Sequence, residues 1–301
     1  MATRNLLGGM EGGGTKFVCA VGYGPDEILE EIRFPTTSPA ETLGRALDFF
    51  ARHRPRLAAI GLAPFGPLDL NPASPSFGSI TATPKPGWAG TNVLAAFRAR
   101  FDLPLAFDLD VNAAAFGEYI WSPSNRGLDS LVYYTIGTGI GAGIVLGGSI
   151  VHGLTHPEAG HISLPHDRAR DPFPGSCPFH GDCFEGLANG PAIGARWGQP
   201  ADSLPDDHPA WELEAEYIAY AMTNTILMLS PQRIVLGGGV MKRLHLFPLI
   251  RQRVGQILNG YVASPVIAGG MDDYIVPPAL GGRSGVLGAM ALGGRILEET
   301  K

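Results

Sequence analysis

The sequence is poor in cysteine, in charged residues and in long apolar runs. Only 3 of its 301 residues are cysteines, which argues against a disulfide-stabilised fold. No apolar run approaches the ~20 residues that a membrane-spanning helix needs, and the amino end lacks the basic and apolar regions of a signal peptide. Charged residues make up 17%, the formal net charge is −6 and no basic cluster stands out. We therefore expect a cytoplasmic protein that binds neither membrane nor nucleic acid.

Glycine and proline are abundant instead, with 42 and 26 residues that lie between apolar runs without a fixed period. This distribution predicts many tight turns. Predicted strands and helices alternate, and strand hairpins head each half, which is typical of an α/β fold in two similar lobes with a cleft between them. Hydrophobic periodicity and capping residues predict helices over 39–53, 92–100, 209–230, 244–258 and 284–298.

The most informative stretch runs from Tyr133 to Leu146 and predicts a strand, a glycine turn and a second strand. Glycines at 137, 139, 141 and 143 leave the backbone N–H groups open to an anion, and Thr135 and Thr138 add hydroxyl donors. It is neither a P-loop nor a dinucleotide fingerprint. Taken alone, an ordinary tight turn explains it equally well. A second copy near the amino end, Met10 to Gly22, favours a duplicated fold that grips one polyphosphate from both sides.

Three further stretches suggest ligand contacts. Residues 63–88 hold six prolines and little periodicity, so they form either a loop over a binding cleft or a surface excursion of no consequence. Asp110 follows a predicted strand and precedes a helix, where open α/β sheets bind ligands, although it and Asn112 could instead act as a plain helix cap. The triplet Gly237–Gly239 allows close approach of a flat ligand such as a nucleobase, or forms a tight turn.

Cys177, His180 and Cys183 have the spacing and the ligand types of a zinc site. A fourth ligand has to come from elsewhere, and His161 is the best candidate, because His166 follows a proline in a charged stretch expected to be open loop. The alternatives are a Cys177–Cys183 disulfide or free thiols beside a chance histidine. Cys19, in an apolar strand, is expected to be a buried thiol.

Together these motifs resemble those of the ROK sugar kinases, and within them the fructokinase subgroup, over nearly the whole chain. The resemblance rests on the following stretches: Glu11-Gly12-Gly13-Gly14-Thr15-Lys16, Asp110-Val111-Asn112 with Glu118, the central glycine hairpin, His156-Pro157-Glu158-Ala159-Gly160-His161, the Cys/His loop, Gly237-Gly238-Gly239, Pro277-Pro278-Ala279-Leu280 and Arg283-Ser284-Gly285. It implies an actin-like (ribonuclease H-like) two-lobed ATPase fold. Residues 1–118 and a terminal helix over about 286–301 would form one lobe, and 119–285 the other. It also implies ATP, Mg²⁺, a structural zinc and a homodimer.

The resemblance further implies that the chain phosphorylates fructose to fructose 6-phosphate, with Asp110 as general base for the 6-hydroxyl. The residues that it implies for the sugar are Gly66, Asn112, Glu158, His161 and Glu185. Those that it implies for ATP are Gly13, Gly14, Thr15, Lys16, Thr135, Gly137, Thr138, Gly139, Gly237, Gly238 and Gly239. Zinc would be held by His161, Cys177, His180 and Cys183, with His161 also contacting the sugar, and Glu11 would reach Mg²⁺ through water.

Three departures from ROK glucokinases matter. Leu109 stands where they have asparagine, Glu11 where they have aspartate, and His180 where they have a third zinc cysteine; the last two are fructokinase-like. Leu109 counts against a glucose-specific site. The alternatives within the family are a glucokinase, a mannokinase or an N-acylhexosamine kinase. A sugar-sensing repressor is disfavoured because the first glycine motif starts at Glu11, leaving no room for a preceding DNA-binding segment, and a sugar-binding protein without activity because Asp110 and both glycine turns are present.

Overall fold

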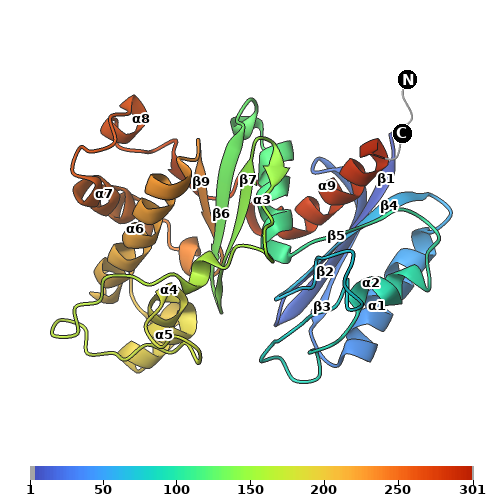
Figure 1. Ribbon diagram of the computed structural model, residues 1–301, viewed down its shortest axis with the longest axis horizontal. Coiled ribbons are helices and arrows are strands. Elements are labelled where there is room, and N and C mark those ends of the chain that lie inside the picture. The colour runs from blue at the N-terminus through green and yellow to red at the C-terminus, as the bar shows by residue number, and fades with distance from the viewer. Residues whose placement is uncertain (1–3, 300–301) are drawn as a thin grey trace. The chain divides into compact units, whose positions relative to one another are not determined.

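The computed structural model describes residues 4–299, and the chain forms two compact units (Figure 1). Unit 1 holds the residues up to Arg126, the segment His152–His156 and the residues from Ala279 onward. Unit 2 holds Gly127–Val151 and Pro157–Pro278. The predicted lobe limits at residues 1 and 301 lie outside the described residues.

Unit 1 is built on a five-stranded sheet in the order β3-β2-β1-β4-β5. Its strands are β1 (Leu6–Gly12), β2 (Lys16–Gly24), β3 (Glu27–Pro35), β4 (Leu57–Pro64) and β5 (Leu105–Phe107), and its helices are α1 (Pro39–His53), α2 (Val93–Arg98), α3 (Asp110–Trp121) and α9 (Ser284–Glu299). β2 pairs antiparallel with β1 and β3, whereas β4 pairs parallel with β1 and β5. The predicted first hairpin is thus confirmed.

Glycines in the sheet of unit 1 let the backbone of helix α9 pack directly against the backbone of the strands. Successive residues of a strand face opposite sides, and a Cβ added to Gly8 would meet Phe50 of α1, whereas one added to Gly9 would lie 2.4 Å from the Val286 carbonyl oxygen of α9. At Gly61 of β4 the same construction places the Cβ 1.7 Å from the Ala289 carbonyl oxygen. The sheet is therefore a middle layer between α1 and α9, and side chains larger than hydrogen would push α9 away.

Local signals explain helix α1. Its N-cap is Ser38, whose hydroxyl accepts from the Glu41 N–H, Pro39 opens the helix, and Arg52 and His53 stand in the last turn where cations offset the helix dipole. The predicted bounds are confirmed. The predicted helices over 209–230, 244–258 and 284–298 appear as α6 (Ala210–Leu229), α7 (Leu246–Leu258) and α9.

Unit 2 repeats the topology of unit 1. Its strands are β6 (Ser130–Ile136), β7 (Ile140–Leu146), β8 (Ser149–Ile150), β9 (Ile234–Gly237) and β10 (Ile275–Val276), in the order β10-β9-β6-β7-β8. As in unit 1, the first strand is central, with two antiparallel strands on one side and two parallel strands on the other. The predicted duplication is therefore present in the sheets. The remaining helices are α4 (Phe184–Ala188), α5 (Gly190–Trp197) and α8 (Pro265–Ala268).

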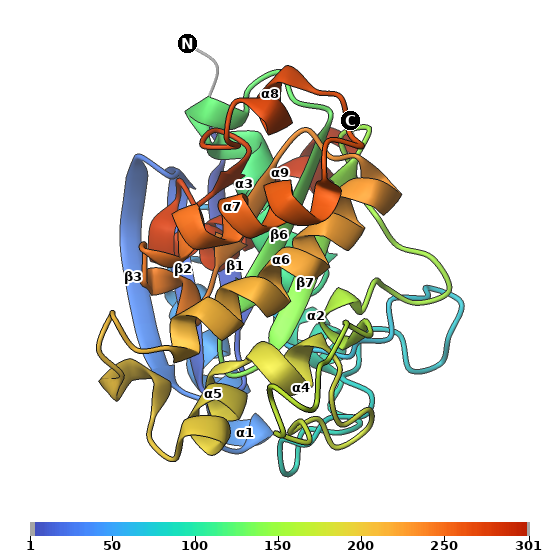
Figure 2. The same cartoon turned by 90° about the vertical axis from the view of Figure 1, so that its left-hand side faces the viewer.

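Helices α6 and α7 cover one face of the β6–β7 sheet (Figure 2). Tyr134 of β6 points into this layer, where its hydroxyl lies 2.8 Å from the Thr225 hydroxyl of α6. Met222 of α6 and Ile250 of α7 are fully buried in the same core. This core fixes the strands whose ends carry the glycine turn.

The central hairpin is longer than the sequence predicted. Gly141 and Gly143 do not belong to the turn but to β7, where they pair with Thr135 and Tyr133 of β6. Only 137–139 lie between the strands, with the Gly137 N–H donating to the Gly139 carbonyl. The error came from reading glycine as a strand breaker, whereas pairing along the whole of β6 outweighs that weak local preference.

Within residues 4–299 no helix is both long enough and apolar enough to cross a membrane.

Candidate active site

Asp110 lies where the sequence placed it, at the passage from a strand end to a helix. It is the first residue of α3, after the carboxyl end of β5, and its side chain is half-buried. The N-cap is Leu109, whose side chain makes no capping hydrogen bond, and the Asp110 Oδ1 accepts from the Val111 N–H at 2.8 Å. Asp110 is therefore not the N-cap residue, although its carboxylate accepts one N–H of the first turn.

The neighbouring carboxylate, Asp108, is buried and organises the start of α3. Its Oδ1 accepts from the Leu109 N–H at 2.8 Å and from the Asn112 side-chain amide at 2.7 Å, and its Oδ2 lies 3.0 Å from Nε2 of His152. This hydrogen bond raises the pKa of His152, partly against the effect of burial. Asp108 thus joins the end of β5, the first turn of α3 and the segment 152–156.

Asn112, which the resemblance implies for the sugar, is buried at the start of α3. It is 1% exposed, and its side-chain amide donates to Asp108. In the described structure it supports the first turn of α3 from within the core rather than presenting a free amide to a ligand.

Gly66 packs against Leu109, the residue that stands where ROK glucokinases have asparagine. A Cβ at Gly66 would come within 2.8 Å of the Leu109 side chain, which is itself buried. Further along this proline-rich loop Trp88 is fully buried and donates its indole N–H to the Thr37 carbonyl at 2.9 Å. The loop is therefore anchored at Trp88 to the core of unit 1.

The first glycine turn, between β1 and β2, is open. Gly14, Thr15 and Lys16 are exposed, and a Cβ at Gly14 would meet nothing within 4 Å. Thr36 braces the turn, because its hydroxyl donates to the Gly13 carbonyl at 2.7 Å. Backbone N–H groups of such a turn can meet an anion at close range.

Glu11, just before this turn, is largely enclosed. Burial raises the pKa of its carboxyl, an effect that Lys16 and a backbone hydrogen bond from Val286 oppose. A Cβ at Gly285 would lie 2.4 Å from the Glu11 carboxyl carbon, so this carboxyl rests directly on the first turn of α9.

In unit 2 the four predicted zinc ligands come together. The ligand atoms of His161, Cys177, His180 and Cys183 all lie within 4.8 Å of one another. His161 Nδ1 is 3.7 Å from the sulfur of Cys177 and 3.5 Å from that of Cys183. Zn–S bonds of about 2.3 Å and Zn–N bonds of about 2.0–2.1 Å give a tetrahedron with S···N edges of roughly 3.5 Å, so the set fits zinc. The cysteines are free thiols, which removes the disulfide alternative.

His166 is not a ligand, but the reason differs from the one expected. Its side chain is 4% exposed rather than in open loop, and it lies 3.0 Å from the Asp182 carboxylate and 3.0 Å from the Asp171 carbonyl. Asp171 in turn accepts from the Tyr217 hydroxyl at 2.6 Å and from Arg196. This buried network ties the Cys/His loop to helices α5 and α6.

Glu158 and Glu185 are near neighbours in unit 2. Burial raises the pKa of Glu158, and the Glu185 carboxylate raises it further. Glu185 Oε2 also accepts from the Ile140 N–H at 2.8 Å, the first residue of β7 after the glycine turn. Glu158 immediately precedes the short helix Ala159–His161, whose last residue is a predicted zinc ligand. The Cys/His loop, the glycine turn and these two carboxyls therefore form one connected region.

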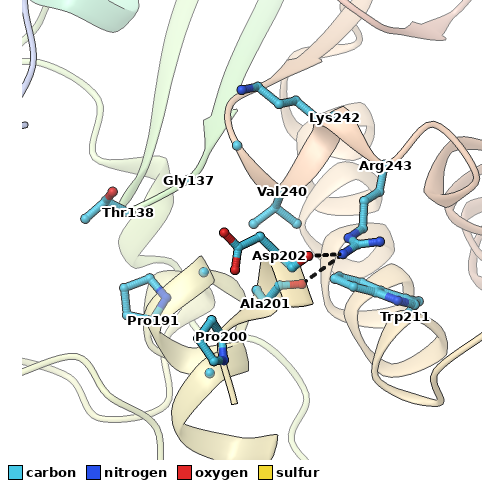
Figure 3. A pocket seen from close by; sticks show the side chains of 13 residues that line it. Gly137, Thr138, Pro191, Pro200, Ala201, Asp202, Trp211, Val240, Lys242 and Arg243 are labelled. Carbon is cyan, nitrogen blue, oxygen red and sulfur yellow. Dashed lines mark hydrogen bonds between the residues drawn. The ribbon is translucent and has the colours of Figure 1, made fainter. Parts of the chain in front are cut away.

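A pocket of about 710 Å³ opens beside the second glycine turn (Figure 3). Of the residues predicted for ATP, Gly137, Thr138 and Gly239 line it. Gly238 does not line it; its φ is +93°, and a Cβ there would lie 2.4 Å from the Ile136 carbonyl oxygen, so the backbone requires glycine at this position.

Sequence reasoning missed most of the pocket wall. The remaining lining residues are Gly190, Pro191, Gly194, Pro200, Ala201, Asp202, Trp211, Val240, Lys242 and Arg243. Two signals were available. Asn189 precedes Gly190 and Pro191 and caps α5, its side chain accepting from the Ala192 N–H, and a cationic pair follows the glycine triplet. Neither signal says which pocket its residues line.

The chain resembles known proteins over nearly its whole length. The model of the ROK family matches residues 7–295. A fructokinase of Pediococcus pentosaceus is 43% identical over 287 residues, covering 95% of this chain and 97% of that one, and a fructokinase of Streptococcus mutans is 42% identical over 294 residues, covering 97% and 98%.

Among solved structures, the ROK hexokinase of Thermus thermophilus matches with a TM-score of 0.78 at 24% identity, covering 98% of this chain and 99% of that one. A likeness at this identity carries the fold alone, and it confirms the predicted actin-like α/β class. The family model and the fructokinase relatives both span nearly the whole chain. The chain belongs to the ROK family.

Proposed function

We propose that this protein is an ATP-dependent fructokinase, which converts fructose and ATP to fructose 6-phosphate and ADP. The observation that carries the proposal is an identity of more than 40% to fructokinases over nearly the full length. The apolar Leu109, buried against Gly66, supports it, because a glucokinase site has a polar asparagine there.

Asp110 is the general base of the proposed reaction. The 6-hydroxyl oxygen of fructose forms a bond to the γ-phosphorus while the bond from that phosphorus to the β,γ-bridging oxygen breaks. ADP leaves with the electron pair, and the hydroxyl proton passes to the Asp110 carboxylate. The half-buried position of Asp110 and the support of the α3 start by Asp108 favour this role.

The two glycine turns are assigned to the phosphates. In unit 1 the exposed turn with Thr15 and Lys16 offers N–H groups and an ammonium, and in unit 2 Gly137 and Thr138 lie at the edge of the pocket. The pocket, with its proline, valine and tryptophan walls, is assigned to the nucleoside. Phosphoryl transfer depends mainly on such positioning and charge stabilisation.

Mg²⁺, when bound with ATP, neutralises charge on the β- and γ-phosphates. Glu11 fits it as an outer ligand, because its carboxyl accepts from the Val286 amide and packs on Gly285. Mg²⁺ keeps several of its waters in such sites, and one of them would bridge to Glu11.

Zinc is assigned a structural role, held by His161, Cys177, His180 and Cys183. His161 turns Nδ1 toward the sulfurs, which leaves Nε2 for a sugar hydroxyl. The metal would thereby hold the ring orientation of a sugar-binding residue. The backbone of Gly66 and the side chains of Glu158 and Glu185 are assigned to the sugar as well, whereas Asn112, being buried, is assigned to support of α3.

Units 1 and 2 are proposed as the two lobes of the kinase. A homodimer and a cytoplasmic location complete the proposal; both come from the resemblance and the composition.

A coupled assay of ADP release tests the proposal, with ATP and Mg²⁺ against fructose, glucose, mannose and N-acetylmannosamine. We expect the highest turnover on fructose, with the phosphate on the 6-oxygen by phosphorus NMR. Asp110→Asn should lower kcat by about 10²–10⁴-fold, the usual contribution of a general base. Asp102→Asn, an exposed aspartate of the same unit, serves as the matched control. A preference for another sugar would retain the kinase and reject fructose, and no turnover on any sugar would reject the enzyme.

A further inference from the structure

The nucleoside pocket contains three ionisable side chains, Asp202, Lys242 and Arg243. All belong to unit 2, and so does the rest of the lining. The inference below rests on the proposed function, in that it takes this pocket to hold the nucleoside of ATP. Beyond that function, it concerns the residue that recognises the ribose of the nucleoside.

Arg243 is already committed to the protein. Its Nη2 donates to the carbonyls of Ala201, Asp202 and Leu204, at 3.1, 3.1 and 2.7 Å. Its guanidinium also stacks over the Trp211 ring at 4.3 Å. Arg243 therefore builds the wall of the pocket and has little donor capacity left for a ligand.

The carboxylate of Asp202, in contrast, is available. Asp202 lies in the short helix Ala201–Ser203, which Arg243 holds through the backbone. Figure 3 shows its carboxylate turned away from Arg243 and into the pocket. Within residues 4–299 the two carboxylate oxygens have no hydrogen-bond or ion-pair partner. A fixed backbone with an unpartnered acceptor group suits recognition of a ligand donor.

The place of Asp202 indicates which part of a nucleotide it meets. In Figure 3 its carboxylate lies between Thr138, at the glycine turn, and Trp211, at the far wall. A nucleotide whose phosphates meet the turn has its ribose next and its base beyond, so the carboxylate stands at the height of the ribose. The vicinal 2′- and 3′-hydroxyls of a ribose are two donors that a carboxylate accepts together.

We propose that Asp202 accepts hydrogen bonds from the 2′- and 3′-hydroxyls of the ATP ribose and thereby makes the enzyme select ribonucleotides over 2′-deoxyribonucleotides. The selection acts in binding, so it changes the KM for the nucleotide more than kcat. The base itself is assigned to apolar contact with the proline and valine side chains of the pocket, and this contact is equal for the two sugars.

The test compares ATP with 2′-deoxy-ATP as phosphate donor to fructose, in wild type, Asp202→Asn and Asp202→Ala. Wild type should prefer ATP by about tenfold or more in kcat/KM, the usual effect of one hydrogen bond to a charged group. The preference should fall in Asp202→Asn, which keeps one neutral acceptor, and come within about twofold in Asp202→Ala. The matched control is Asp207→Asn, an exposed aspartate of the same segment that does not line the pocket.

Calorimetric binding of ADP and 2′-deoxy-ADP separates this inference from the proposed function. It needs no sugar and no turnover, so a wild type that fails to phosphorylate fructose still reports on Asp202. A tighter binding of ADP that Asp202→Ala removes and Asp207→Asn retains supports the role. Equal binding of the two nucleotides by wild type, binding of neither, or a preference that survives Asp202→Ala overturns it.

Discussion

Glu118 is a fully buried carboxyl on α3, and its removal should destabilise unit 1 markedly. Its Oε2 accepts from the Ala279 N–H at 3.1 Å, and its Oε1 accepts from the Leu280 N–H at 2.9 Å and the Ser284 hydroxyl at 2.7 Å. These bonds attach the start of α9 to the helix that begins with Asp110. The perturbation that tests this link is Glu118→Ala.

The expected loss follows from the donors left behind. In Glu118→Ala the Ser284 hydroxyl still has the Gly281 carbonyl at 3.0 Å, but the amides of Ala279 and Leu280 lose their acceptor. The two amides are part-buried, and each costs about 1–3 kcal/mol when it loses its acceptor; removing a carboxyl whose pKa burial already raises offsets part of this. We expect a net loss of about 2–4 kcal/mol.

Thermal unfolding measures this loss. For a domain of about 150 residues, 1 kcal/mol corresponds to roughly 2–4 °C, so the Tm of unit 1 should fall by roughly 5–15 °C. Glu118→Gln, which keeps one oxygen acceptor, should lose about half as much. Glu298→Ala removes an exposed glutamate from α9 and should leave the Tm unchanged. If Glu118→Ala unfolds at the same temperature as Glu298→Ala, the reasoning is refuted.

Two further predictions concern pH and metal. Because Asp108 raises the pKa of His152 above the value of about 6.5 in the unfolded chain, the stabilisation from this pair is complete below that pH and is lost as the pH rises through the folded-state pKa. His152→Gln should cost about 1 kcal/mol at pH 5.5 and less at pH 9, a modest effect because the side chain is 42% exposed; an equal loss at both pH values by urea unfolding would contradict this. Cys183→Ser should abolish the binding of about one zinc per chain, measured by elemental analysis, and raise the KM for fructose more than the KM for ATP. A variant with full zinc and unchanged KM values would argue against the assigned ligands.

The sequence by itself determined those parts of the protein whose signals are contiguous. Helix α1 carries its cap, its opening proline and its closing cations within one short stretch, so its bounds could be predicted. The same holds for the first glycine turn and for three of the proposed zinc ligands, which lie within 177–183. The role proposed for Asp110 came from a strand end followed by a helix, and from the resemblance to a family. These are local patterns, and they can be recognised in the sequence without knowledge of the fold.

Only the tertiary structure decided what depends on residues far apart in the chain. The side chains of Asp108 and His152 form a hydrogen bond although the two residues are 44 positions apart in the chain. No local sequence pattern in either segment predicts this contact. The sequence suggests Asn112 as a ligand contact, and only the tertiary structure shows that it is buried beside Asp108. The role proposed for Asp202 rests on Arg243, 41 positions later, which holds its backbone, while its carboxylate has no partner among residues 4–299. Packing and long-range pairing assign each polar group its partner, and a polar group left without a protein partner at a pocket is available to a ligand.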